Sequence, residues 1–281
     1  MLKHRVLSAV LILAVVFGAA FWLPAFGLFL IVLALAMLGT VEFLSFLRSA
    51  RFPHHPSLII GGALVFLTSL YYSLRHGSVL APEEMEVLVL VLYVAAVFVT
   101  PVWIAGSGSP MHGVFASVGA LFYVPFLFGF LLKLLFAWPV GEGRLLVLYL
   151  ILVVKFSDIG AYFVGCSFGK HKLIPRISPA KSWEGCAGGV GASLLMSLAF
   201  YAVFRGDLGV VRLNLLDATA LGLLLPVVAI HGDLIESMFK RAADVKDSSA
   251  MVRGMGGWLD VLDSLLFAAP ALYLYARLFL L

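Results

Sequence analysis

Residues 231–264, HGDLIESMFKRAADVKDSSAMVRGMGGWLDVLDS, decide how this chain is interpreted. The stretch carries six Asp/Glu and four Lys/Arg side chains, although only 12% of the 281 residues are charged. It lies between two strongly apolar runs, 215–230 and 265–281. A carboxylate at the centre of a bilayer costs roughly 2.5–3.5 kcal/mol, so charged groups beside such runs need a partner or a chemical role.

The spacing of these polar residues indicates two helix faces. A spacing of i, i+4, i+7 and i+8 places four of them on one face of a helix: Asp233, Ser237, Lys240 and Arg241. Asp260 and Asp263 are spaced i, i+3 and are expected to share a face of the next helix. Oxygen ligands beside Lys and Arg favour Mg²⁺ shared with a phosphate. These residues therefore predict a metal–phosphate site at a membrane face.

The composition places the chain among integral membrane proteins. Hydrophobic residues make up 63% of it and the mean hydropathy is +1.09, well outside the soluble range. Two cysteines, Cys166 and Cys186, support neither a disulfide framework nor a cysteine-rich metal site, and we expect buried free thiols.

The apolar runs predict an all-α fold, a polytopic membrane bundle of about nine transmembrane helices. Each run is long enough to cross roughly 30 Å of hydrocarbon. We expect one integral membrane domain, 1–281, in which N-terminal helices (1–140) precede a catalytic half that carries the motifs (141–281). The expected spans are 6–23, 27–47, 58–74, 87–105, 113–137, 144–165, 184–204, 215–239 and 257–280.

The distribution of Lys and Arg predicts the orientation. With the N-terminus in the cytoplasm, twelve of the nineteen basic residues lie inside, five lie outside, and Lys133 and Lys155 fall within spans. This arrangement places the loops at 166–183 and 240–256 on the cytoplasmic side. We therefore expect an inner-membrane protein with a cytoplasmic active site.

A second polar segment covers residues 155–189, KFSDIGAYFVGCSFGKHKLIPRISPAKSWEGCAGG. Lys155 and Asp158 are spaced i, i+3 and can form an ion pair. Ser178-Pro179 is typical of an N-cap followed by proline at the first helical position. That reading places three polar residues in the opening turns, where they could hold a phosphate: Lys181, Ser182 and Glu184.

Both segments resemble the phosphatidate cytidylyltransferase (CDP-diacylglycerol synthase) family. In the first, the similar strings are Ser237-x-x-Lys240-Arg241, Lys246-Asp247, Gly256-Gly257 and Leu259-Asp260-x-x-Asp263-Ser264. In the second they are Ser157-Asp158-x-x-Ala161-Tyr162, Phe168-Gly169-Lys170-His171 and Ser178-Pro179-x-Lys181-Ser182-x-Glu184-Gly185. Together they cover about 110 residues. The chain departs from many members at Met255, where they have His, and at Val261, where they have Arg.

The resemblance implies transfer of a cytidylyl group from CTP to phosphatidate, which gives CDP-diacylglycerol and pyrophosphate. It implies Mg²⁺, with a second cation possible, on Asp233 and Asp260, with Asp247 and Asp263 as further ligands or as groups that support the ligands. Three basic residues would balance the remaining charge: Lys240, Arg241 and Lys246. Three glycines would let backbone N–H groups approach phosphate oxygens: Gly254, Gly256 and Gly257. The remaining substrate-binding candidates are Asp158, Lys170, Lys172, Ser178, Lys181, Ser182, Glu184 and Ser237.

The expected partners are CTP, phosphatidate and membrane lipids, without nucleic acid. Three other functions stay open: a CDP-alcohol phosphotransferase, a CTP-dependent lipid kinase and a cation-coupled transporter. Small residues at 185–192 permit close helix packing, either inside the bundle or in a homodimer. Glu42 is expected to be solvated near a helix end, or paired with Arg48 or Arg51.

Overall fold

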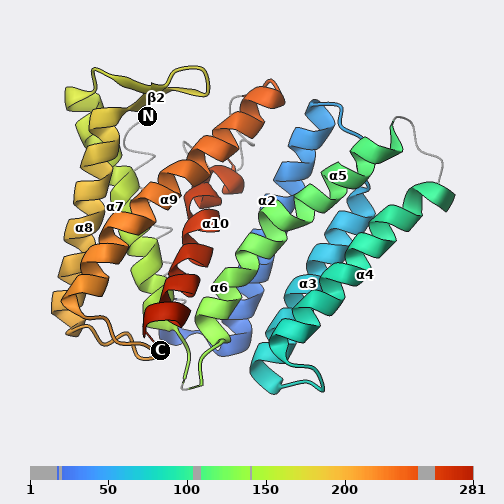
Figure 1. Ribbon diagram of the computed structural model, residues 1–281, viewed down its shortest axis with the longest axis horizontal. Helices are drawn as coiled ribbons and strands as arrows, with labels where there is room; N and C mark the ends of the chain where they lie inside the picture. The colour runs from blue at the N-terminus through green and yellow to red at the C-terminus, as the bar shows by residue number, and fades with distance from the viewer. Residues whose placement is uncertain (1–17, 19–20, 104–108, 140, 246–256, 281) are drawn as a thin grey trace. The chain divides into compact units, whose positions relative to one another are not determined.

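The computed structural model describes residues 18, 21–103, 109–139, 141–245 and 257–280, and every structural statement below refers to them. The described chain is almost entirely helical, as predicted (Figure 1). In order, its elements are α2 (Ala25–Ser49), α3 (Pro56–His76), α4 (Pro82–Trp103), α5 (Pro110–Leu121), η1 (Phe122–Phe126), α6 (Leu127–Phe136), α7 (Arg144–Phe168), β1 (Lys172–Ile174), β2 (Ser178–Ser182), α8 (Trp183–Phe204), α9 (Leu215–Ala242), α10 (Trp258–Tyr275) and η2 (Ala276–Leu280).

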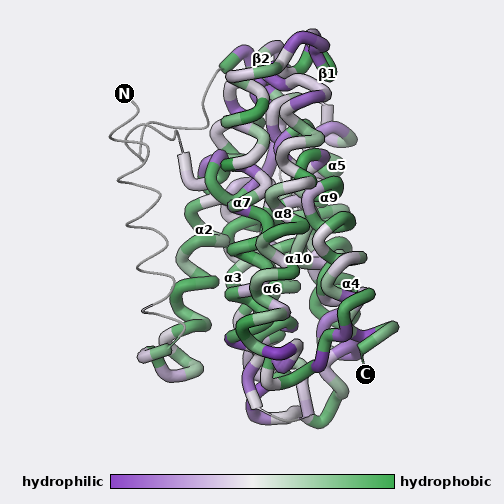
Figure 2. The backbone as a smooth tube through the Cα atoms, turned by 90° about the vertical axis from the view of Figure 1, so that its left-hand side faces the viewer, coloured by the Kyte–Doolittle hydropathy of each residue, from purple (hydrophilic) through white to green (hydrophobic). Residues whose placement is uncertain are grey.

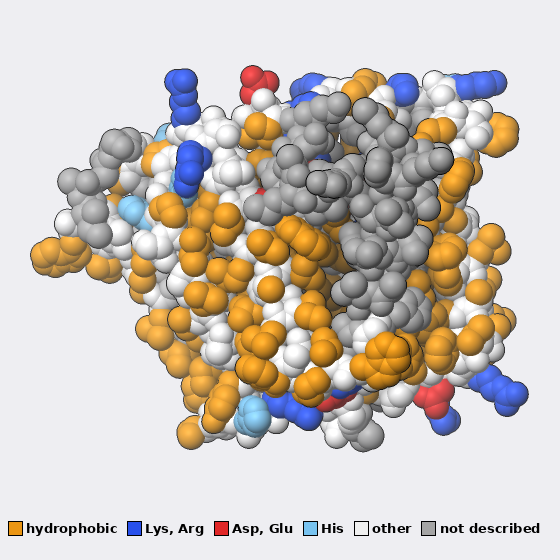
Figure 3. Space-filling view, turned by 180° about the vertical axis from the view of Figure 1, so that it is seen from behind, with side chains coloured by type: hydrophobic (Ala, Val, Ile, Leu, Met, Phe, Trp, Pro, Cys, Tyr) orange, Lys and Arg blue, Asp and Glu red, His pale blue; other side chains and the backbone are white. Residues whose placement is uncertain are grey.

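Eight helical segments of the described chain are long and apolar enough to cross a membrane. They coincide with the second to ninth predicted spans, and the first, 6–23, lies mostly outside the described residues. The segment Pro110–Phe136 is continuous through a π-helical turn that contains Pro125, which has no N–H to donate. Hydrophobic residues dominate the helix bodies (Figure 2), and hydrophobic side chains cover most of the described surface seen in Figure 3.

The chain forms two compact units. Unit 1 comprises 1–136 and 239–261, and unit 2 comprises 137–238 and 262–281. Helices α9 and α10 therefore each contribute one end to unit 1 and the remainder to unit 2. The division into 1–140 and 141–281 stays a prediction.

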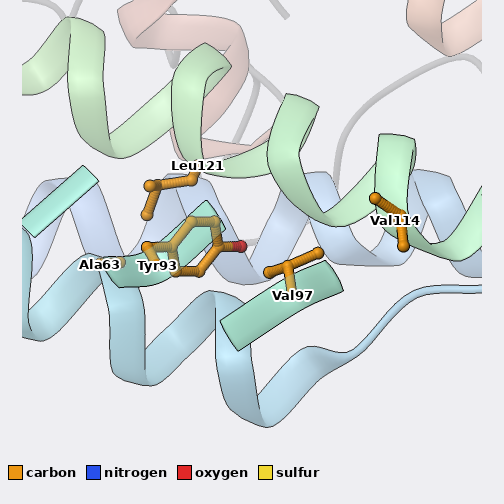
Figure 4. Packing of buried hydrophobic residues seen from close by; sticks show 5 residues of the cluster. All are labelled: Ala63, Tyr93, Val97, Val114 and Leu121. Carbon is orange, nitrogen blue, oxygen red and sulfur yellow. The ribbon is translucent and has the colours of Figure 1, made fainter. Parts of the chain in front are cut away.

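In unit 1, helices α3, α4 and α5 pack around a small apolar cluster (Figure 4). Tyr93 of α4 lies at its centre and is buried, and its hydroxyl donates a hydrogen bond to the Ser117 carbonyl oxygen at 2.8 Å. The phenol thus finds a polar partner inside an otherwise apolar contact. The cluster consists of Ala63, Tyr93, Val97, Val114 and Leu121.

In unit 2, helices α7 and α8 pack closely along their small residues. A Cβ added at Gly189 would lie 2.9 Å from the Ser157 carbonyl oxygen, and one at Gly188 would overlap Val164. The small-residue pattern of α8 therefore serves packing inside the bundle, the first of the two predicted alternatives. The Tyr149 hydroxyl and Ser197 Oγ lie 2.7 Å apart, and Ser197 donates to the Ala218 carbonyl oxygen, which links α7, α8 and α9.

Both cysteines are free, as predicted. Cys166 is exposed and Cys186 is only half-buried, so the prediction of buried thiols is wrong. Both residues belong to the α7–α8 pair, and the close approach of the two helices is achieved by glycines that leave the cysteines at its margin.

Candidate functional site

The segment that joins α7 to α8 is a β-hairpin, in which β1 and β2 pair in antiparallel fashion. Ser178 and Pro179 belong to strand β2, so the prediction that a helix begins there is wrong. Proline fits this position because its φ suits an extended strand and a two-stranded ribbon has free edges. Helix α8 begins at Trp183, and Ser182 caps it by accepting a hydrogen bond from the Gly185 N–H at 3.1 Å.

Glu184, in the first turn of α8, fastens the base of the hairpin. Its carboxylate accepts hydrogen bonds from the backbone N–H groups of Lys170 and His171 at 3.2 Å. The His171 ring nitrogen Nδ1 lies 2.6 Å from the same carboxylate. Glu184 therefore has a clear structural task, and its predicted contact with substrate stays a prediction.

The hairpin brings one lysine to an aspartate of α9. Lys181, on β2, places its Nζ atom 2.7 Å from Asp233 Oδ2. Ser237, one turn further along α9, donates a hydrogen bond to Asp233 Oδ1 at 3.3 Å, as their i, i+4 spacing predicts. Asp233 lies nine residues before the end of α9, about 14 Å along the helix axis. Lys181 thus places the positive charge of the hairpin beside a carboxylate in the body of α9.

Asp233 belongs to a cluster of three carboxylates in unit 2. The cluster comprises Asp233, Glu236 and Asp263, and their ligand oxygens all lie within 4.8 Å of one another. Glu236 is fully buried and Asp263 is 5% exposed. Three carboxylates so close repel one another strongly in surroundings of low dielectric constant. A hard divalent cation with oxygen ligands, such as Mg²⁺, fits this donor set.

Two members of this cluster, Asp233 and Asp263, were predicted from the sequence as metal ligands, and Glu236 was not. Glu236 was assigned no role, although its i, i+3 spacing from Asp233 on an apolar helix could have indicated it. On α7, the predicted ion pair is confirmed, with Lys155 Nζ 3.0 Å from Asp158 Oδ2. The contact of Asp158 with substrate stays a prediction.

In unit 1, the end of α9 meets the start of α10. Lys240 Nζ lies 2.5 Å from Asp260 Oδ1, and both side chains are largely buried. The other oxygen, Oδ2, accepts a hydrogen bond from the Gly257 N–H at 2.7 Å, which is half of a capping box. The Gly257 N–H, predicted to face a phosphate, is therefore donated within the chain. Asp260 is held by a lysine and a backbone group, and its role as a metal ligand stays a prediction.

Glu42 of α2 completes the start of α10. Its Oε1 and Oε2 atoms accept hydrogen bonds from the Trp258 and Leu259 N–H groups at 3.0 Å and 2.8 Å. The side chain is only 4% exposed, so the prediction of a solvated Glu42 is wrong. A polar cap contributes about 1 kcal/mol, and a buried carboxylate needs such partners because burial of an unpaired charge is costly. No local pattern in the sequence indicates this contact, because the partners are 216 residues apart.

The remaining predicted site residues are either at the surface or outside the described residues. Arg241, Lys170 and Lys172 are exposed, and Ser178 is half-buried. Four predicted residues lie outside the described residues, and their roles stay predictions: Lys246, Asp247, Gly254 and Gly256.

Comparison with known proteins decides the family. A model of the cytidylyltransferase family matches residues 3–279. The chain belongs to this family. The match confirms the resemblance drawn from the motifs and extends it to the N-terminal helices, which those motifs do not reach.

Named relatives agree with this membership. The chain is 34% identical to a phosphatidate cytidylyltransferase of Haemophilus influenzae over 285 residues, which cover 96% of each chain. It is 38% identical over 272 residues to one of Pseudomonas aeruginosa, with 96% of this chain and 95% of the relative covered. A third, of Bacillus subtilis, is 43% identical over 137 residues, 49% of each chain.

Proposed function

We propose that this cytidylyltransferase transfers the cytidylyl group of CTP to phosphatidate and forms CDP-diacylglycerol and pyrophosphate. The family and the names of the full-length relatives support this proposal. The observation that carries it is the cluster of Asp233, Glu236 and Asp263, with Lys181 paired to Asp233. Such a site suits two polyanionic substrates, which must be neutralised before they can meet.

The reaction needs no enzymic nucleophile. A phosphomonoester has its second pKa around 6, so the phosphate of phosphatidate is already an anion near neutral pH. One of its oxygens forms a bond to the α-phosphorus of CTP, and the bond from that phosphorus to the β-phosphate oxygen breaks. Pyrophosphate leaves with the electron pair. The protein therefore has to orient the two phosphates in line and balance their charge.

Mg²⁺ fits the carboxylate cluster, and we propose that Asp233, Glu236 and Asp263 hold it. When bound, it supplies positive charge to the nucleotide phosphates. Lys181 has its Nζ atom beside the cluster and would exchange part of its contact with Asp233 for a phosphate oxygen. Lys240 would serve the same purpose from the end of α9, with Asp260 as its resting partner. Asp247, Asp260 and a second cation stay candidates for the metal site.

The membrane context gives the lipid substrate a direct route. The eight apolar helices make the chain an integral membrane protein. We propose that it lies in the inner membrane of a bacterium, with the hairpin of unit 2 on the cytoplasmic side, where CTP is available. We further propose that its ligands include no nucleic acid. The small residues of α8 pack against α7, so they do not support a homodimer, which stays a prediction.

Product analysis tests this function. Purified protein in liposomes is supplied with CTP, phosphatidate and Mg²⁺, and each is then omitted in turn. We expect pyrophosphate and CDP-diacylglycerol only when all three are present. Further reactions supply the substrates of the other functions. With CTP and diacylglycerol, release of CDP and formation of phosphatidate would instead identify a kinase. With CDP-diacylglycerol and an alcohol, release of CMP would identify a phosphotransferase, and ion flux without a covalent product would identify a transporter.

A further inference from the structure

Two carboxylates of unit 1 hold the start of α10. Gly257 precedes the helix, and Trp258 and Leu259 are its first two residues. The N–H of Gly257 is donated to Asp260, and the next two N–H groups are donated to Glu42. The N–H groups at the start of a helix have no partner in the helix itself, and here two side chains accept hydrogen bonds from three of them.

The two carboxylates differ in what they can contribute. Asp260 is a residue of α10 and supplies an ordinary local cap. Glu42 comes from α2 and is buried, so it ties the start of α10 to a separate helix of the same unit. A local serine could cap the helix without placing a carboxylate in the apolar helix α2. Capping alone therefore does not account for a glutamate on α2.

The held turn is the one that carries Asp260. Because Glu42 accepts hydrogen bonds from the N–H groups of both Trp258 and Leu259, it fixes the position and direction of the backbone that leads into Asp260. Asp260 in turn holds the Nζ atom of Lys240 at 2.5 Å. The chain of contacts therefore runs from Glu42 through the start of α10 to Asp260 and Lys240.

We propose that Glu42 is a positioning residue for cytidylyl transfer, acting through the start of α10 on the Asp260–Lys240 pair. This rests on the proposed function, in which Lys240 contacts a substrate phosphate. Glu42 itself touches no substrate in this scheme. Its negative charge also complements the positive end of the helix dipole, so the amide of glutamine would replace it only in part.

The first test is kinetic. Glu42→Gln keeps the length of the side chain but loses the charge and one of the two accepting oxygens. We expect kcat per folded molecule to fall at least about tenfold in this variant. In an Asp260→Asn background, the same substitution should cost less than about threefold, since the pair that Glu42 positions is already broken. Equal fold losses in both backgrounds would overturn the proposal.

The matched control is Glu86→Gln. Glu86 of α4 is a largely buried carboxylate of the same unit, 2.6 Å from Lys133. Helices α2, α3 and α4 alternate in direction, and Glu86 lies near the first residue of α4, at the end of unit 1 opposite to the end of α2 that carries Glu42. We expect Glu86→Gln to lower the melting temperature and to leave kcat per folded molecule within about twofold. A melting-temperature loss without a kcat loss in Glu42→Gln would make Glu42 merely structural.

The second test does not depend on activity. Amide hydrogen exchange of the full chain in detergent is followed over residues 257–262. We expect exchange there to accelerate at least about tenfold in Glu42→Gln and to stay unchanged in Glu86→Gln. Unchanged exchange in both would overturn the proposal even if the wild type formed no CDP-diacylglycerol. Should Glu42→Gln not fold, Glu42→Asp, which keeps the charge on a shorter side chain, is subjected to both measurements with the same criteria.

Discussion

Lys181 of the hairpin places its Nζ atom 2.7 Å from the carboxylate of Asp233, a member of the buried carboxylate cluster. From this contact we predict two opposite effects of Lys181→Met, one on the use of CTP and one on the Mg²⁺ requirement. Loss of the positive charge should lower kcat/KM for CTP at least about tenfold, because a phosphate loses its cation. The same loss should reduce the Mg²⁺ concentration needed for half-maximal rate, because the cluster becomes more negative. Both are read from Mg²⁺ titrations at several CTP concentrations.

Arg176→Met is the control for Lys181→Met. Arg176 lies in the exposed turn between β1 and β2, and its substitution removes the same charge from the same hairpin. We expect its kinetics to stay within about threefold of the wild type. Similar losses for the two variants would mean that the hairpin acts only through its overall charge.

Asp263→Asn tests the carboxylate cluster. Asparagine keeps the size of the side chain but removes a full negative charge from the donor set. We expect activity to fall by about two orders of magnitude or more while the protein stays folded, and Glu236→Gln to follow in the same direction. Asp217 caps the other end of α9, and we expect the Asp217→Asn variant to keep its activity. Near-normal turnover of Asp263→Asn at low Mg²⁺ would exclude the cluster from the metal site.

Substitutions of the Lys240–Asp260 pair test whether Lys240 contacts a substrate or only stabilises the fold. Lys240→Met should lower turnover at least about tenfold and also the stability, because it leaves Asp260 without this cation. The double variant Lys240→Met/Asp260→Asn should regain part of the stability, measured by thermal unfolding, but none of the turnover. Recovery of both would show that the lysine serves the fold alone.

The glycines of α8 predict a contrast in stability. Gly188→Ala places a methyl group against Val164 of α7 and should destabilise the protein by about 1–3 kcal/mol. Gly191→Ala, three residues further along the same helix, meets no atom within 4 Å and should be tolerated. Thermal unfolding in detergent checks both variants. Equal melting temperatures would contradict the close packing of α7 and α8.

The predicted orientation is tested by labelling single cysteines. Cys166 and Cys186 are first replaced by alanine, and cysteine is then introduced at Lys172 or at Gly209. These positions lie beyond opposite ends of α8, in the hairpin and in the segment that joins α8 to α9. We expect an impermeant thiol reagent added outside intact cells to label the Gly209 position and to spare the Lys172 position. The reverse pattern would place the hairpin outside.

The spans and the Lys155–Asp158 ion pair could be predicted because they depend on local pattern. Runs of apolar residues predict helices of membrane length, and i, i+3 or i, i+4 spacing predicts contacts such as that of Lys155 with Asp158. The start of α8 was mispredicted because Ser-Pro suits both an N-cap and an extended strand. The pairing of Ser178 with Ile174, which decides between them, is a tertiary contact.

Other features of the site are invisible to local pattern for the same reason. The i, i+3 spacing places Glu236 near Asp233 on α9, but the closeness of both to Asp263 is a contact between two helices. Lys181 reaches Asp233 across 52 residues of sequence, through a hairpin whose register no periodicity specifies. Pairing between distant segments therefore accounts for what the sequence analysis missed, whereas the chemistry of the residue types was already apparent.

The separation between Glu42 and α10 has a consequence for how the protein is made. A chain emerges from the ribosome at about 5–20 residues per second, N-terminus first. Trp258 follows Glu42 by 216 residues. Synthesis of these residues takes roughly 10–40 s, and the two N–H donors of Glu42 do not exist before then. Throughout that interval α2 carries a carboxylate without these bonds. Insertion of the first membrane helices thus precedes, and cannot depend on, the contact that later fixes the start of the last one.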